Sequence, residues 1–219
     1  MKTLPTLSLI ALGAALAGCA PQPTEPVRTS VANYEGLEQV ASRYFDVALV
    51  RPGVRFANYG RVIVQAPELA FRTPDRSLQQ FPLDDDQKAR FRNMLQAKFD
   101  AEIARSATLQ VTDAAEAGVI DLHVRVQDIL ATVSPQTVGQ SGRGGLALRA
   151  LGEATLVIEL RDAQSEETLA RVFDRRAVQG VAMFQQDAPI TRWEDVEKLC
   201  QHWARTVRER LDAVVSGRY

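Results

Sequence analysis

Alternation of apolar and polar residues near the middle of the chain is the feature that most restricts its fold. Apolar residues occupy every second position from Ile120 to Val126, and the pattern returns from Leu156 to Leu160. A strand of this kind buries one face and exposes the other to water. We therefore expect the two segments to pair as a long antiparallel hairpin whose apolar face is covered by another layer.

Two segments with helical spacing supply that layer. The first follows Asp84-Asp85-Asp86 and reaches Ile103, and acidic residues at a helix start satisfy free N–H groups and complement the dipole. The second begins near Trp193 and reaches Val214. With further strands predicted over 59–67, 109–111 and 168–178, the patterns indicate an α+β two-layer sandwich, a mostly antiparallel sheet of about five strands with two long helices on one face.

The N-terminal segment predicts a lipid anchor. An apolar run from Leu4 to Leu16 follows Lys2, and it is too short for a membrane span, which needs roughly 20 apolar residues. The run ends in Leu16, Ala17, Gly18 and Cys19, which resembles the bacterial lipobox. In that motif the cysteine becomes the first mature residue and carries a diacylglycerol and usually an acyl chain such as palmitate.

The lipobox also predicts the domain organisation and the location. We expect a signal peptide over 1–18, a lipidated Cys19 with a flexible tether over 19–43, and a single domain over 44–219. In lipoproteins that this chain resembles, Asp after the cysteine favours retention at the inner membrane. Because Ala20 stands there, we expect the protein to be anchored in the outer membrane and to face the periplasm.

Catalytic and metal-binding signatures are scarce. The two histidines, His123 and His202, are not in a triad-like or metal-ligand spacing, and Cys200 lies in an apolar helical pattern typical of a buried thiol. We therefore predict no enzyme activity, no metal, and no cofactor beyond the lipid on Cys19. A carboxylate pair formed by folding, such as Asp128 with Glu159, is left open.

The charge balance excludes one class of partner. The net charge is −1, whereas nucleic-acid binding calls for a basic stripe. We therefore predict no nucleic-acid partner. The glycine-rich segment from Gly139 to Gly145 does not predict nucleotide binding either, because it lacks the Gly-Lys-Ser/Thr ending of a phosphate-binding loop.

Several short segments, taken in their order along the chain, resemble the bacterial lipoproteins catalogued as domain of unknown function 3313. The resemblance covers about Tyr44 to Leu211 and implies a Gram-negative envelope lipoprotein, with no catalytic residues to carry over. The segments are Leu49–Gly53, Tyr59–Val64, Leu122–Asp128, Asp174–Arg176 and Thr191–Trp193 with Trp203.

Two functions are consistent with these features. The first is a non-catalytic interaction or accessory module that binds another envelope protein through the polar sheet face and the glycine-rich segment. The second is a carrier of lipid or a peptidoglycan fragment, which needs a cavity lined by Phe91, Phe99 and Trp203. The oligomeric state is left open. The basic residues predicted as partner contacts are Arg143, Arg175, Arg176 and Arg192.

Overall fold

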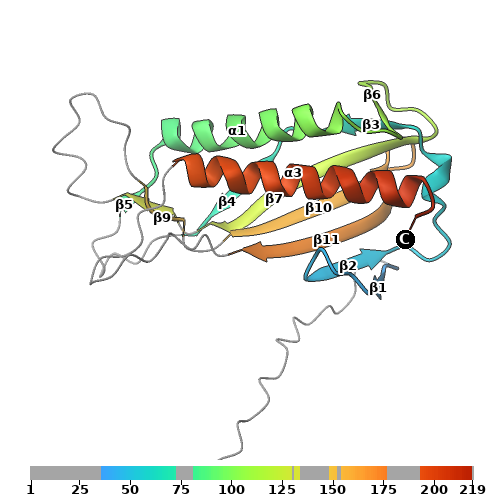
Figure 1. The fold of residues 1–219 in the computed structure, drawn as a ribbon, viewed down its shortest axis with the longest axis horizontal. Coiled ribbons are helices and arrows are strands. Elements are labelled where there is room, and N and C mark those ends of the chain that lie inside the picture. Colours follow the sequence, from blue (N-terminus) through green and yellow to red (C-terminus); the bar gives the residue numbers. More distant parts are fainter. Residues whose placement is uncertain are drawn as a thin grey trace, which may run out of the picture. The chain divides into compact units, whose positions relative to one another are not determined.

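The described residues form an α+β domain with one large sheet and two long helices (Figure 1). The structure is a computed structural model that describes residues 36–72, 81–129, 131–133, 148–151, 154–176 and 193–218. Several predicted features lie outside these ranges: the signal segment, the lipobox residues Leu16, Ala17 and Gly18, Cys19, Arg143, Arg192 and the glycine-rich segment.

Within the described ranges the large sheet has eight strands, in the order β1-β2-β11-β10-β7-β3-β6, and β4 also pairs with β7. A separate three-stranded sheet has the order β5-β8-β9. The bounds are β1 Glu38–Val40, β2 Val47–Val50, β3 Arg61–Val64, β4 Glu68–Phe71, β5 Phe81–Pro82, β6 Gln110–Val111, β7 Val119–Ile129, β8 Ala131–Val133, β9 Leu148–Leu151, β10 Ala154–Asp162 and β11 Thr168–Arg176, with a 3₁₀ turn η1 over Phe56–Asn58.

The predicted antiparallel pair is confirmed as β7 and β10. Leu122 lies opposite Leu160, and Val126 lies opposite Leu156, so the apolar residues of both strands share one face. β11 then pairs antiparallel with β10 and corresponds to the strand predicted over 168–178. These three strands form the centre of the sheet.

The sheet is larger than predicted and is mixed. In place of about five mostly antiparallel strands, the described residues place eight strands in the large sheet, and β3, β4 and β6 join it through parallel pairings. The helix α1 (Asp85–Ile103) lies between β3 and β7 in the chain. Because a strand that returns after a crossing helix lies parallel to the strand before it, β3 and β7 run in the same direction.

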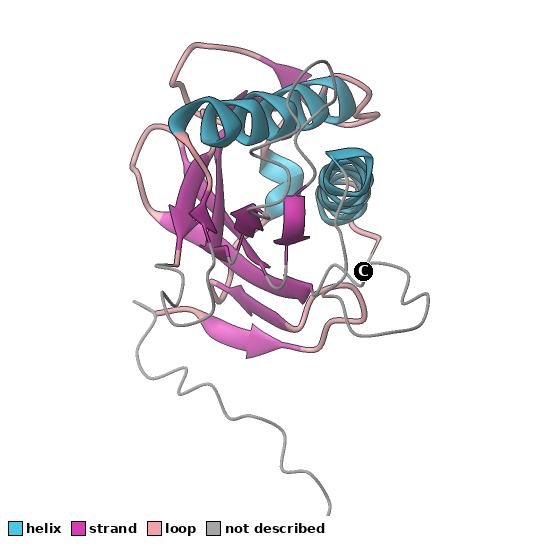
Figure 2. Ribbon diagram, turned by 90° about the vertical axis from the view of Figure 1, so that its left-hand side faces the viewer, coloured by secondary structure: helices cyan, strands magenta, loops and turns pink. Residues whose placement is uncertain are grey.

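Both predicted helices are confirmed and lie on one side of the sheet (Figure 2). α1 begins with a capping box, in which Asp84 Oδ1 accepts from the Gln87 backbone N–H at 2.7 Å and the Gln87 side chain accepts from the Asp84 N–H. The second helix, α3 (Trp193–Val215), packs beside α1. Within the described ranges, neither helix is long and apolar enough to span a membrane.

The core lies between the helices and the sheet. Phe91, Phe99 and Trp203 are each 1% exposed and belong to the same apolar cluster as the inward residues of β7 and β10. Side chains buried to this degree are typical of close-packed protein interiors. These three positions therefore give the carrier hypothesis no support.

Candidate binding surface on the open face of the sheet

The candidate site lies on the sheet face turned away from α1 and α3, here called the open face. Side chains alternate along a strand, so Leu122 and Val124 of β7 enter the core while His123 and Arg125 point the other way. The antiparallel register places Glu159 of β10 opposite His123 on one side and opposite Arg171 of β11 on the other. Three strands thus bring polar side chains together.

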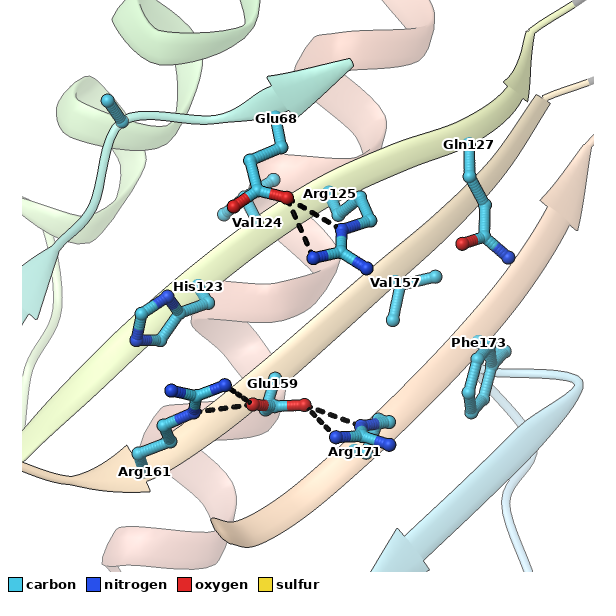
Figure 3. Close-up of a pocket in the computed structure, with 11 residues that line it drawn as sticks. Glu68, His123, Val124, Arg125, Gln127, Val157, Glu159, Arg161, Arg171 and Phe173 are labelled. Atoms are coloured by element: carbon cyan, nitrogen blue, oxygen red, sulfur yellow. Dashed lines mark hydrogen bonds and ion pairs between the residues drawn. The ribbon is translucent and has the colours of Figure 1, made fainter. Parts of the chain in front are cut away.

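Glu159 is the centre of an ionic cluster on this face. Its side chain is held by the guanidinium groups of Arg161 and Arg171, each of which donates through Nε and Nη2 to one carboxylate oxygen (Figure 3). Glu159 is only 9% exposed. Burial raises the pKa of its carboxyl, but the hydrogen bonds and charges of the two arginines outweigh burial and hold the pKa below the ordinary 4.5.

A second set of polar contacts links β7 to the parallel strands. Arg125 donates through Nε to Glu68 Oε2 at 2.8 Å, and its Nη2 lies 2.7 Å from the same oxygen. Asp121 accepts from the Gln65 amide at 2.8 Å and lies 2.9 Å from His123 Nε2. Glu68 lies on β4 and Gln65 follows β3, so this side of the surface depends on parallel pairings with β7 that the sequence did not predict.

The ionic cluster around Glu159 and the Arg125–Glu68 pair line a hollow of about 470 Å³ (Figure 3). Val157 and Phe173 lie opposite each other on β10 and β11 and give the hollow an apolar part. Arg125, Gln127, Glu159 and Arg171 are among the polar residues around them. The volume falls within the range of about 300–1,000 Å³ typical of ligand sites, so the hollow is large enough for a bound group.

The ionisation of Glu159 limits the chemistry that this residue can perform. Glu159 is ionised and paired with two arginines, so it cannot act as a proton donor near neutral pH. Among the described residues, no group of three or more His, Cys, Asp or Glu side chains is arranged to hold a metal ion. Arginine and aromatic side chains, represented here by Arg171 and Phe173, are enriched at protein interfaces.

Other residues singled out by the sequence lie apart from the hollow. Asp128 Oδ1 is 3.5 Å from Arg72 Nε, so Asp128 and Glu159 each have arginine partners and do not form a carboxylate pair. Cys200 is 0% exposed, and burial raises the pKa of its thiol to about 12. His202 lies exposed on α3.

The predicted basic cluster is divided by the sheet. Arg175 is exposed, and its backbone N–H donates to Asp46 Oδ2 at 2.7 Å. Its neighbour Arg176 donates to Asp174 Oδ2 at 2.9 Å, and Asp174 is turned toward α3. Consecutive residues of a strand point to opposite faces, so only Arg175 shares the open face with the hollow.

The sequence pattern indicates only part of the cluster around Glu159. Glu159 and Arg161 are two residues apart on one alternating strand, which places both on the polar face. Arg171 joins them only through the β10–β11 register, which shifts between Leu160 and Arg161. That irregularity has no clear signal in the sequence.

Several solved structures are similar to this chain. The PelC dodecamer from Paraburkholderia phytofirmans matches with a TM-score of 0.37 and 11% identity, over 80% of this chain and 96% of that one. A protein from Xanthomonas campestris matches with a TM-score of 0.38 and 12% identity, over 73% and 86%. A DUF4136 family protein from Bacteroides thetaiotaomicron matches with a TM-score of 0.38 and 6% identity, over 83% and 98%.

The amino-acid sequence was compared with curated proteins and with protein families. No curated protein matches the chain. Residues 28–207 match the family described as protein of unknown function (DUF3313), which is the family that the short segments in the sequence resemble. The match covers most of the 219 residues, and the chain therefore belongs to the DUF3313 family.

Proposed function

We propose that this protein is a non-catalytic interaction module of the bacterial cell envelope, which binds another envelope protein through the open face of its sheet. The observation that carries the proposal is the hollow beside Glu159, because it combines an apolar patch with oriented charged groups. The two long helices cover the opposite face, so the hollow lies where a partner can approach.

The location is part of the same proposal. The lipobox ending in Cys19 supports a lipid anchor, and Ala20 supports the outer membrane with the domain facing the periplasm. Two or three acyl chains anchor a protein stably, since each buried CH₂ contributes about 0.8 kcal/mol. The tether predicted over 19–43 must end before β1, because Glu38–Val40 pairs with β2 in the large sheet. A tether between Cys19 and β1 would let the domain reach partners beyond the lipid surface.

Site-specific crosslinking in living cells tests the proposal. A photoreactive amino acid replaces Thr155, which lies opposite Gln127 on the open face, or Asn93, which is exposed on α1. We expect a discrete protein product from position 155 and none from position 93. The product should disappear in Ala66→Trp, which fills the hollow, and persist in Ala101→Trp on the exposed side of α1.

Two results would contradict the proposal. One is the same set of crosslinked proteins from positions 155 and 93, which would mean that the crosslinks form with any nearby protein and not with a specific partner. The other is a product from position 155 that Ala66→Trp leaves unchanged, which would mean that the hollow is not used. The alternative of a carrier has no comparable observation in its favour, because Phe91, Phe99 and Trp203 are packed in the core.

A further inference from the structure

Two hydrogen-bond donors at the hollow are left without a protein acceptor in the described part of the chain. Arg125 uses Nε and Nη2 for Glu68, which leaves its Nη1 amine unpaired among the described residues. The side-chain amide of Gln127 likewise has no hydrogen-bond partner within the described ranges. Both side chains extend from β7 toward the hollow (Figure 3).

The charge of the hollow points to the kind of group that these donors accept. Three arginines line it, Arg125, Arg161 and Arg171, against two glutamates, Glu68 and Glu159, so these groups leave one positive charge in excess. One carboxylate would balance that charge. A surface with several negative groups would be repelled by the two glutamates, which disfavours polyanions such as an anionic lipid surface.

The apolar part of the hollow gives a second requirement. Val157 lies directly opposite Arg125 across the β7–β10 pair and opposite Phe173 across the β10–β11 pair. A group that places its carboxylate at Arg125 therefore brings its neighbouring atoms over Val157 and Phe173. In an extended peptide, residues two positions apart lie on the same side, so an acidic and an apolar side chain can meet both requirements at once.

We propose that the hollow binds an extended segment of the partner protein through one Asp or Glu side chain, whose carboxylate accepts hydrogen bonds from Arg125 Nη1 and the Gln127 amide. An apolar side chain two residues away packs on Val157 and Phe173. This inference rests on the proposed function and adds the chemistry of the partner. An apolar centre surrounded by polar groups matches the apolar core and polar rim of protein interfaces.

Peptide titration of the full chain tests the inference. The probe is the peptide acetyl-Leu-Thr-Glu-Thr-Leu-amide, the control peptide has Gln in place of Glu, and binding is followed by NMR shifts of backbone amides. We expect the Glu peptide to shift Arg125, Gln127 and Val157 and to bind about five- to tenfold more tightly than the Gln peptide, as one charge-assisted contact at a half-exposed site predicts.

Three variants separate the proposed contact from a general effect of charge. Arg125→Gln should weaken the Glu peptide about five- to tenfold, whereas Arg92→Gln, an exposed arginine on α1, should leave binding unchanged. Glu68→Gln should strengthen binding, because it releases Arg125 and raises the charge of the hollow by one. Arg125→Gln and Glu68→Gln both break the same ion pair but should change peptide binding in opposite directions. A general loss of structure would weaken binding in both variants.

The results that would overturn this inference differ from those that would contradict the proposed function. Equal binding of the Glu and Gln peptides, no shifts at millimolar peptide, or no effect of Arg125→Gln would overturn the inference. So would Arg125-dependent binding to phosphatidylglycerol vesicles or inorganic phosphate that exceeds binding to the peptide. If the crosslinked product in cells requires an open hollow but is unchanged in Arg125→Gln, the proposed function stands and this inference fails.

Discussion

Asp174 shows how a single buried carboxylate links the sheet to a helix. It is 3% exposed, and its Oδ2 accepts hydrogen bonds from Trp203 Nε1 at 3.0 Å and from Arg176 Nε at 2.9 Å. Trp203 is the largest fully buried side chain, and its indole N–H needs an acceptor in the core. Asp174 thus satisfies the one polar atom that the tryptophan brings into the apolar cluster.

Replacing Asp174 should therefore destabilise the domain. In Asp174→Ala the indole N–H loses its acceptor, and we expect the free energy of unfolding to fall by about 1–3 kcal/mol, the cost of a buried unsatisfied group. Urea denaturation followed by tryptophan fluorescence measures the change. The control is Asp113→Ala, an exposed aspartate, which should stay within about 0.5 kcal/mol of the wild type. Equal midpoints for both variants would contradict this role.

At the scale of elements, a buried ionic network joins the two helices. Glu102 of α1 is 2% exposed and accepts from Arg208 Nε at 3.0 Å and from the Gln201 amide at 2.6 Å, both on α3. Arg208 also lies 3.3 Å from Asp212, which accepts from Ser106 and Thr108 beyond the end of α1. Burial raises the pKa of Glu102, but these hydrogen bonds and the nearby arginine charges outweigh burial and leave the pKa below 4.5.

This network should make the helix pair sensitive to acid. A carboxyl whose folded pKa lies below its unfolded value stabilises the fold above the unfolded pKa, and that stability is lost as the pH falls through the folded pKa. We expect the wild type to lose stability as the pH falls below the ordinary pKa of 4.5. Glu102→Gln should be less stable at pH 7 and should show a flatter dependence of unfolding free energy on pH between about 5 and 3.

Chemical denaturation at a series of pH values provides the measurement. Glu197 on the exposed side of α3 offers a matched control, because its pKa is also lowered, through Lys98, but it is not buried. Glu197→Gln should change the stability at pH 7 far less than Glu102→Gln does. A pH profile of Glu102→Gln parallel to that of the wild type would exclude Glu102 as a source of the acid sensitivity.

The start of α1 supplies another test at this scale. The capping bond from the Gln87 N–H to Asp84 should be lost in Asp84→Ala, which we expect to lower the unfolding free energy by about 0.5–2 kcal/mol. Asp84→Ser keeps an oxygen that can accept the same bond and should remain close to the wild type. Thermal or urea denaturation of the two variants distinguishes them. Equal losses would mean that charge at the helix start matters more than the cap.

At the scale of the whole molecule, the sequence predicted those features of the fold that depend on residues close together in the chain. The period-two runs around Val124 and Ile158 and the helical runs after Asp84 and Trp193 identified the central strands and both helices, because burial of one face leaves a local pattern. The parallel position of β3 beside β7 was not predicted, since it depends on how α1 crosses the sheet. The polar face of β7 was predicted, but the grouping around Glu159 depends on a register that local patterns do not specify.

The location of the whole molecule in the cell envelope depends on the predicted lipid anchor. The chain contains two cysteines, Cys19 at the end of the lipobox and the buried Cys200. Cells grown with radiolabelled palmitate should label the wild type and Cys200→Ser equally, whereas Cys19→Ser should carry no label, because the predicted attachment site is the lipobox cysteine. On a sucrose gradient, the labelled protein should sediment with outer membranes. Label retained in Cys19→Ser, or labelled protein in the inner-membrane fraction, would contradict the proposed anchor or its location.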